Sequence, residues 1–249
     1  MDSLDIVLIF QDLKDTFYRC FIVEDRWKWL VEGFGKSLVI TFFAVLIGLV
    51  CGVLLAAIRS SYDKNEESLR MKGGFGFWGL RFLNTVSKVY ITVIRGVPVV
   101  VQLMIWYFVI LVSQKNDVII AIFAFGFNSA AYVAEIFRGG IMAVDNGQFE
   151  AGRSLGFNYI RTMKNIIIPQ AVKSTLPTLL NEVIALLKET SVAGYVGIMD
   201  LTKAGELIVG RSFESFMPLI AVAIIYLITV IVLTKVFTAV ERRLRRNER

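Results

Sequence analysis

Residues 150–169 read EAGRSLGFNYIRTMKNIIIP, and this polar stretch separates two strongly apolar parts of the chain. It carries Glu150, Arg153, Arg161 and Lys164, so it is too charged to enter the hydrocarbon core of a bilayer. Apolar segments long enough to cross a membrane nevertheless lie on both sides of it. We therefore expect a membrane protein that holds one polar segment at the bilayer surface, where a water-soluble partner can bind it.

The composition of the whole chain agrees with a membrane protein. Its 249 residues are 56% apolar and have a mean hydropathy of +0.64, well above the values of soluble proteins. Histidine is absent, which removes the commonest general base and the commonest metal ligand. The two cysteines, Cys20 and Cys51, form no CxxC pair. We expect no catalytic residue, no metal site and no disulfide.

Five apolar segments are predicted to cross the membrane. A helix needs ~20 residues to cross ~30 Å of hydrocarbon, and residues 37–58 and 215–234 meet this length without any charge. The other three segments carry ionisable residues, and hydropathy supports the last of them least. They are residues 89–113, 118–140 and 174–196.

The distribution of lysine and arginine predicts the orientation. Residues 59–88 hold six basic side chains, residues 138–173 hold five, and the tail from residue 235 holds six. The alternate loops hold only Lys115 in one and Lys203 and Arg211 in the other. The positive-inside rule then places the N-terminus outside, and the C-terminus and residues 150–169 in the cytoplasm. The same rule explains the net charge of +6 without a nucleic-acid partner.

These segments divide the chain into three predicted parts. Residues 1–33 form an extracytoplasmic N-terminal segment, residues 34–240 a transmembrane domain, and residues 241–249 a basic cytoplasmic tail. The transmembrane domain includes a polar cytoplasmic region at about 143–169, for which the family resemblance given below implies a coupling role.

Three short patterns are weak signals. Gly74 to Gly79 match GxGxxG, but no predicted strand precedes them, so we expect no dinucleotide site. Gly35-Lys36-Ser37 resembles the end of a P-loop, but Leu30 stands where that motif needs glycine, so we expect no ATP site in this chain. Gly48 and Gly52 form GxxxG, which serves either dimerisation or packing within one chain, and we favour the latter.

The polar segment itself predicts a short helix over roughly 147–154. Gly156 suits the C-terminal end of such a helix, and Pro169 suits the first turn of the next one. The spacing Glu-Ala-Gly-x3-Gly-x9-Ile-x-Ile-Pro resembles the EAA motif of permease subunits in binding-protein-dependent ABC importers. In that family the motif forms a helix that docks into a groove of the ATPase subunit. Gly152 stands where a second alanine is usual, and it should loosen the helix by up to ~1 kcal/mol.

The resemblance extends from about residue 33 to the end, and it narrows to the polar amino acid branch of these permeases. Residues 90–102, YITVIRGVPVVVQ, look like that branch's signature, with Val97 where threonine is usual. Residues 128–141, NSAAYVAEIFRGGI, match closely, and so do residues 187–191, LKETS, although Glu189 replaces the more typical aspartate. Residues 60–80 depart most from the family pattern.

The resemblance implies two sets of functional residues. The set that would couple to the ATPase comprises Gln148, Glu150, Ala151, Gly152, Leu155, Gly156 and Pro169. The set that would line the substrate pathway comprises Arg95, Gln102, Asn128, Tyr132, Glu135, Asn181, Glu182, Lys188, Glu189, Thr190 and Ser191.

Physical reasoning supports a pathway role for polar residues inside the predicted spans. An ionisable group at mid-membrane costs ~2.5–3.5 kcal/mol, so it should face protein, water or substrate. Asn181 and Lys188 are seven residues apart, as are Glu182 and Glu189, so two polar stripes follow one helix and suit a zwitterionic amino acid. Arg95 suits a carboxylate.

Structural alternatives remain open for several of these residues. Glu135 and Arg138 are three residues apart and can simply pair. Lys188 and Glu189 can extend toward the interface instead of the pathway, and Arg95 can pair with a neighbouring side chain.

Together these features predict an all-α membrane protein with about five transmembrane helices and the type I ABC importer permease fold. The resemblance implies a subunit that imports polar amino acids such as glutamine, glutamate, cystine or basic amino acids across the bacterial cytoplasmic membrane. It would pair with an identical or related permease, two ATPase subunits and an extracytoplasmic solute-binding protein. The chain would be no enzyme and hold no cofactor, because ATP and Mg²⁺ belong to the ATPase. The alternatives are a passive channel or ion-coupled carrier and, more weakly, a membrane-embedded enzyme.

Overall fold

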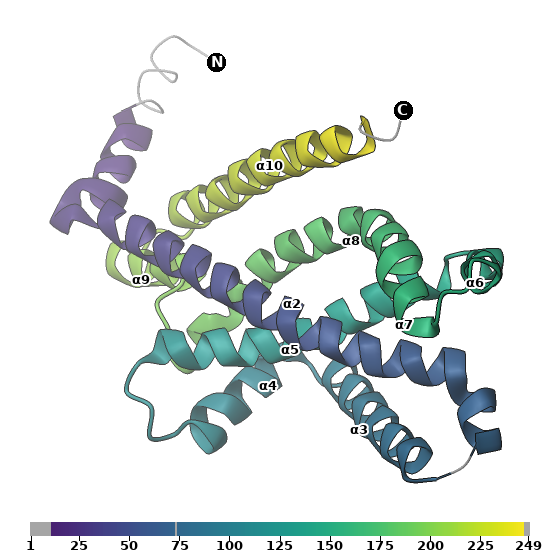
Figure 1. The fold of residues 1–249 in the computed structure, drawn as a ribbon. Helices are drawn as coiled ribbons and strands as arrows, with labels where there is room; N and C mark the ends of the chain where they lie inside the picture. Colours follow the sequence, from purple (N-terminus) through teal and green to yellow (C-terminus); the bar gives the residue numbers. More distant parts are fainter. Residues whose placement is uncertain (1–10, 73, 247–249) are drawn as a thin grey trace.

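The computed structural model describes residues 11–72 and 74–246, and every regular element among them is helical (Figure 1). The prediction of an all-α protein is therefore confirmed. The α-helices are α2 (Trp27–Lys72), α3 (Phe75–Gly96), α4 (Val99–Ile105), α5 (Asp117–Met142), α6 (Asn146–Ser154), α7 (Tyr159–Thr162), α8 (Ile168–Glu189), α9 (Leu201–Ser212) and α10 (Phe216–Arg246). Short π-helical turns follow α4 (Trp106–Ile110) and precede α8 (Met163–Ile167), and a 3₁₀ segment follows α8 (Thr190–Val196).

Among the described residues, three helices are long and apolar enough to cross a membrane. They are Trp27–Lys64 within α2, Asp117–Met142 and Phe216–Leu244, and the bent pair Gly76–Gly96 and Val99–Ile110 makes a fourth if it counts as one span. The fifth predicted span, residues 174–196, begins inside α8 and includes the 3₁₀ segment that follows it; the 22 residues of α8 extend about 33 Å. Because Glu182, Lys188 and Glu189 lower its hydropathy, α8 does not meet the same criterion, and its crossing stays a prediction.

Helix α2 is much longer than the predicted first span. The apolar run ends at Arg59, but the helix continues to Lys72, so most of the loop predicted over residues 59–88 is helical. The reason is that residues 59–72 contain no glycine or proline and are rich in good helix formers. The start of α2 at Trp27 likewise places the predicted domain boundary at residue 33 inside a helix.

The prediction of one continuous helix over residues 89–113 is wrong. The chain bends by 110° between α3 and the segment that starts with α4. Val97 is extended, with φ −105° and ψ 134°, because a residue before proline avoids helical angles. Pro98 then precedes α4, and its missing N–H costs nothing at a helix start.

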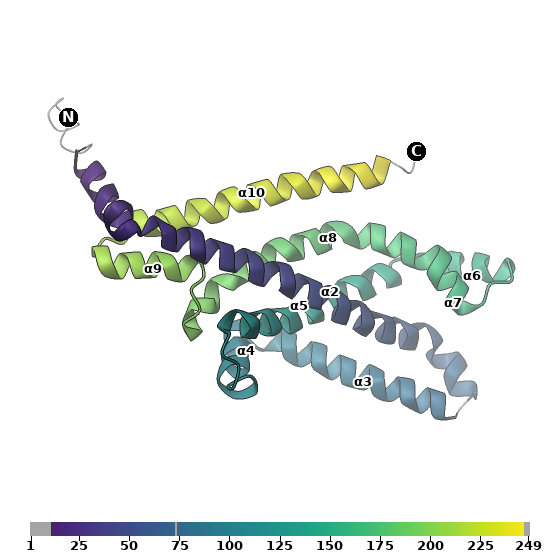
Figure 2. The same cartoon turned by 60° about the vertical axis from the view of Figure 1, so that its left-hand side comes forward.

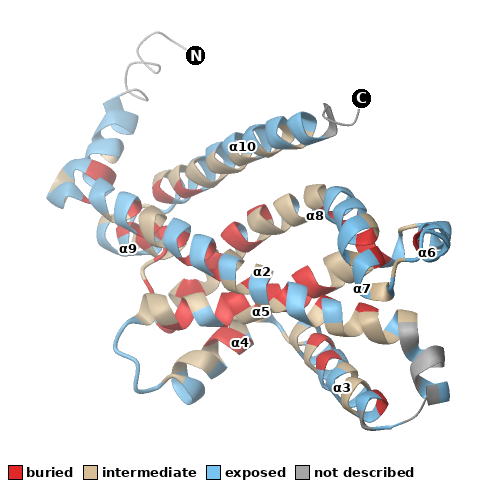
Figure 3. Ribbon diagram, viewed as in Figure 1, coloured by how far each residue is buried: buried red, intermediate tan, exposed pale blue. Residues whose placement is uncertain are grey.

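The centre of the molecule is the contact between α2 and α5, where many buried residues gather (Figures 1 and 3). A Cβ atom on Gly48 would lie 2.8 Å from Ser129 Oγ, and one on Gly52 would lie 2.6 Å from Val133 Cβ. These glycines therefore let α5 approach α2 closely. The expectation that the GxxxG pattern serves packing within the chain is confirmed.

The predicted outer end of the molecule contains α9, a helix that the sequence analysis did not identify. Asp200 caps it by accepting hydrogen bonds from the backbone N–H groups of Thr202 and Lys203. α9 packs against α2 and the first part of α10, while the rest of α10 extends beside α8 (Figure 2). Cys20, from the N-terminal segment, is buried in the apolar cluster that α9 forms with α2 and the first part of α10.

Candidate functional site

The predicted coupling helix is present as α6, Asn146–Ser154, within a residue of the bounds expected at each end. Asp145 begins it by accepting a hydrogen bond from the N–H of Gly147. Gly156 ends it with a φ of +74°, a conformation that glycine adopts without strain. The N–H groups of Gly156 and Phe157 donate to the carbonyls of Arg153 and Gly152, which is a Schellman ending. α6 is therefore a closed unit capped at both ends.

One face of α6 packs firmly against the segment that follows it. Phe149 is buried, and its ring stacks on Tyr159 with 6.5 Å between centroids. Gly152 is buried against Thr162, and a Cβ atom on Gly152 would lie 2.7 Å from both Cγ2 and Oγ1 of Thr162. The expectation that Gly152 only loosens the helix is therefore incomplete. The missing side chain is what permits α7 to lie this close.

The opposite face of α6 is exposed. Gln148, Ala151 and Leu155, at positions i, i+3 and i+7, share this face, and Leu155 is 70% exposed. Glu150 is also exposed, on another side of the helix. A capped helix with an exposed leucine on one side and an exposed carboxylate on another offers a surface that a second protein can bind.

Two contacts attach α6 to the long helices α2 and α8. Lys64, on the extended part of α2, donates a 2.8 Å hydrogen bond to Asn146 Oδ1, and its ammonium lies 4.8 Å from the ring centre of Phe149. Gln170 on α8 donates to Gln148 at 3.3 Å. Through these contacts, a force on α6 would reach both α2 and α8.

Pro169 lies at the second position of α8, where its lack of an N–H leaves little unsatisfied. The π-helical turn Met163–Ile167 directly precedes α8, so the coupling segment continues into this helix without a loop.

A first group of predicted pathway residues meets between α5 and α8. Asn128 donates from Nδ2 to Glu189 Oε2 at 3.4 Å, and Ser129 donates to Glu182 Oε1 at 3.3 Å. The structure thus points the Glu182 and Glu189 stripe at α5 of the same chain. Ser129 was not among the predicted site residues, although its place next to Asn128 inside an apolar helix was a usable signal.

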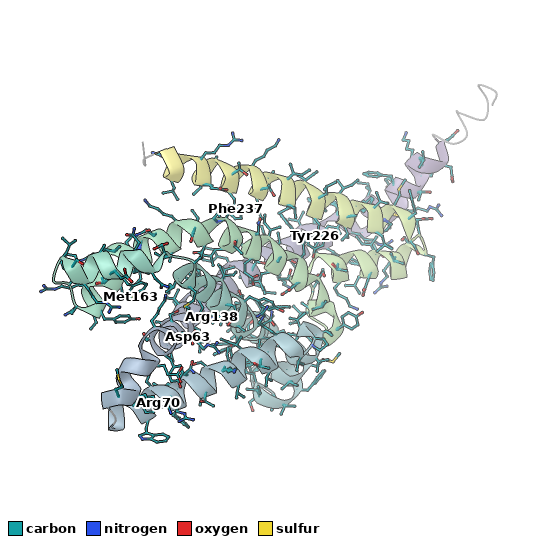
Figure 4. The ribbon with its side chains drawn as sticks, turned by 90° about the vertical axis from the view of Figure 1, so that its right-hand side faces the viewer. Asp63, Arg70, Arg138, Met163, Tyr226 and Phe237 are labelled. Carbon is teal, nitrogen blue, oxygen red and sulfur yellow. The ribbon has the colours of Figure 1, made fainter. Side chains whose placement is uncertain are left out.

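A second group lies between α2, α3 and α5 (Figure 4). The Arg95 guanidinium lies 5.4 Å from the ring centre of Tyr132. Arg138 pairs with Glu135 at 3.1 Å and with Asp63 on α2 at 3.4 Å. The alternative interpretation of Glu135 and Arg138 as an ion pair is therefore confirmed, and Asp63 is a partner that the sequence analysis missed.

The remaining predicted pathway residues lie apart from these two groups. Gln102 is buried at the bend after α3, where its Nε2 donates to the carbonyls of Ile94 and Val97 at 2.7 and 2.8 Å. Its amide nitrogen is therefore committed to holding the bend. Asn181 lines a narrow pocket against α10, and Lys188 is exposed. Thr190 is buried and donates its hydroxyl to the carbonyl of Leu187, and Ser191 is half-buried.

One stripe of α5 connects the two groups. Asn128, Tyr132 and Glu135 are at positions i, i+4 and i+7, so they share one side of the helix and span about 10 Å along it. Polar side chains therefore continue from Glu189 at one end to Arg138 at the other.

Comparison with known proteins gives a consistent result. The model of the family described as binding-protein-dependent transport system inner membrane component matches residues 74–246. The chain is 34% identical to an arginine transport system permease protein of Bacillus subtilis, over 88% of this chain and 94% of the relative. It is 35% identical to a glutamine transport system permease protein of Escherichia coli, over 87% of this chain and 93% of the relative.

A solved structure of an amino acid ABC transporter with histidines matches 90% of this chain and 98% of its own, with 34% identity and a TM-score of 0.75. An inward-facing methionine ABC transporter shares the fold with a TM-score of 0.70 at 17% identity. The chain thus has the fold of ABC importer permeases, and it belongs to the family of binding-protein-dependent transport system inner membrane components.

Proposed function

We propose that this chain is the membrane-spanning subunit of an ATP-driven importer of polar amino acids. In this proposal a separate ATPase subunit binds α6, and its closure moves α6 together with α2 and α8 as a rigid body. The substrate passes along the polar stripe of α5.

The observation that carries the proposal is the construction of α6. A helix that is capped at both ends, buried on one face and exposed on the other is built to transmit a force rather than to fill a loop. The rigid attachments through Lys64 and Gln170 extend this argument, because they connect α6 to two long helices.

The cargo is inferred from the relatives and the polar groups. The two relatives are named for arginine and glutamine transport, and both cargoes are polar amino acids. The α5 stripe ends on carboxylates of α8, and the guanidinium of Arg95 on α3 lies over Tyr132 of the stripe, so the two elements offer a partner to each charged end of a zwitterion.

The proposed assembly contains more than this chain. Four or five spans are few for a gated pathway, so we propose that a second permease, identical or related, completes it. Two ATPase subunits on the cytoplasmic side and a solute-binding protein outside complete an importer in the bacterial cytoplasmic membrane. ATP and Mg²⁺ bind to the ATPase subunits in this scheme.

The test is a charge reversal on the exposed face of α6. In proteoliposomes that contain the whole complex, Glu150→Lys should abolish ATP-dependent uptake, because it places a cation where the ATPase meets a carboxylate. The matched control is Glu66→Lys, which reverses an exposed charge on the extended end of α2 and should leave uptake unchanged. Full uptake by Glu150→Lys would contradict the proposal.

The same assay separates the proposal from its main alternative. A passive channel or ion-coupled carrier would move amino acids without ATP in the vesicles. Uptake that continues without ATP, or that follows an ion gradient, would favour that alternative.

A further inference from the structure

An apolar groove of about 540 Å³ lies where the coupling segment meets the membrane-crossing helices. α2 contributes Val53 and Ala57, and the segment after α6 contributes Ile160 and Met163, which is labelled in Figure 4. Phe137 of α5 lies between them. Neither α6 nor the polar groups on α5 and α8 described above supply any of the groove's lining.

The two ends of the groove differ in chemistry. Val53 and Ala57 belong to the charge-free part of α2, so this end lies within the hydrocarbon. The other end is formed by Lys164, which is exposed and makes no ion pair with another described residue. Arg161 precedes Lys164 by one helical turn and is also exposed. The groove therefore runs from an apolar interior to a cationic rim.

We propose that this groove binds one anionic phospholipid, with an acyl chain between α2 and α8 and the headgroup phosphate at Lys164. An amphiphile with an apolar tail and a negative head is the molecule whose charge and polarity match both ends. A helix from a second permease would fill the apolar end of the groove. The positive charge at its rim would then have no partner of opposite charge in the groove.

The location gives this lipid a consequence for the coupling segment. The residue before Ile160 is Tyr159, which lines the groove and also stacks on Phe149 of α6. A bound acyl chain thus supports the surface on which α6 rests.

The experiment uses the full chain in bilayer nanodiscs that contain a trace of phosphatidylglycerol with a photoreactive group in its acyl chain. Illumination and peptide mass spectrometry should locate adducts in residues 53–61 and 159–172. Ala57→Trp fills the groove from an exposed position and should lower this labelling by about five-fold or more. Val86→Trp, on an exposed position of α3 outside the groove lining, should leave it unchanged.

Lys164→Gln tests the headgroup. It should lower the preference for phosphatidylglycerol over phosphatidylcholine with the same chains by about five-fold, the effect of one basic residue near an anionic surface. Lys235→Gln removes an exposed charge outside the groove and should leave this lipid preference unchanged. Val172→Trp replaces Ala57→Trp if the latter fails to insert.

Three results would overturn the inference. One is labelling that Ala57→Trp leaves unchanged. Another is equal labelling by phosphatidylcholine in the parent chain. The third is a disulfide bond that forms between two copies of the Ile160→Cys variant and prevents labelling by the lipid probe.

Discussion

The pair Gly152 and Thr162 permits a prediction whose sign depends on one contact. Alanine is a better helix former than glycine by about 1 kcal/mol, so propensity alone predicts that Gly152→Ala stabilises α6. In the structure, however, the new Cβ would lie 2.7 Å from Cγ2 and Oγ1 of Thr162, a side chain that is 2% exposed. Overpacking of this kind costs ~1–3 kcal/mol. We therefore expect Gly152→Ala to weaken the docking of α6 by up to ~2 kcal/mol.

Thr162→Ala supplies the matched background for this test. It removes both atoms at 2.7 Å, and the third of the three nearest atoms, the Thr162 Cβ, lies 3.2 Å from the position of the new methyl group. In this background Gly152→Ala should therefore be neutral or stabilising. A change of sign between the two backgrounds is the expected outcome.

Hydrogen exchange of the α6 amides in nanodiscs measures the effect. A loss of one to two kcal/mol lowers the protection of these amides by roughly 5- to 30-fold. Uptake in proteoliposomes should fall in parallel if docking of α6 transmits the force. Two results would refute the reasoning. One is an unchanged protection of the α6 amides in the Gly152→Ala variant that keeps Thr162. The other is a double variant in which the effects of Gly152→Ala and Thr162→Ala on this protection simply add.

Three further substitutions test other contacts. Gln102→Leu should lower the thermal stability of the purified chain, because two half-buried carbonyls lose their donor at a cost of ~1–3 kcal/mol, and a transition unchanged from the parent would contradict this. Gly52→Ala should reduce the yield of folded protein through a clash with Val133, whereas Gly35→Ala, whose added Cβ would meet no atom within 4 Å, should not. Glu182→Ala should lower substrate-stimulated ATPase activity of the complex while insertion remains normal, and full stimulation would exclude Glu182 from the pathway.

The sequence predicted α6 well because its signals are local. The end at Gly156 and the start of the next helix at Pro169 act on the backbone within a few residues and do not depend on distant contacts. The bend at Val97 and Pro98 was equally local, and it was missed because hydropathy received more weight than proline geometry. The length of α2 was missed for the same reason, since hydropathy reports where a membrane ends and not where a helix ends.

The polar stripes of α8 show what the sequence alone cannot supply. A spacing of seven places Glu182 with Glu189, and Asn181 with Lys188, on two adjacent lines of one helix. Which line faces the interior depends on how α8 is rotated against α5, and that rotation follows from side chains about 50 to 60 positions away in the sequence. The hydrogen bonds from Asn128 and Ser129 determine the answer: the carboxylate line meets α5, and the Asn181 line is left exposed.

This rotation bears directly on how the pathway would work. Carboxylates that already accept hydrogen bonds from α5 are held in place before a substrate arrives, so a substrate ammonium would compete with one weak donor at each of them among the described residues. Both bonds are long, at 3.4 and 3.3 Å, and a charged donor would replace a neutral one, which favours exchange. Because α8 also continues from the coupling segment through the turn at Met163–Ile167, the same helix presents the carboxylates and receives the motion of α6. A shift of α8 against α5 would lengthen these two contacts first, which makes them the point where movement of α6 would change the affinity for a substrate.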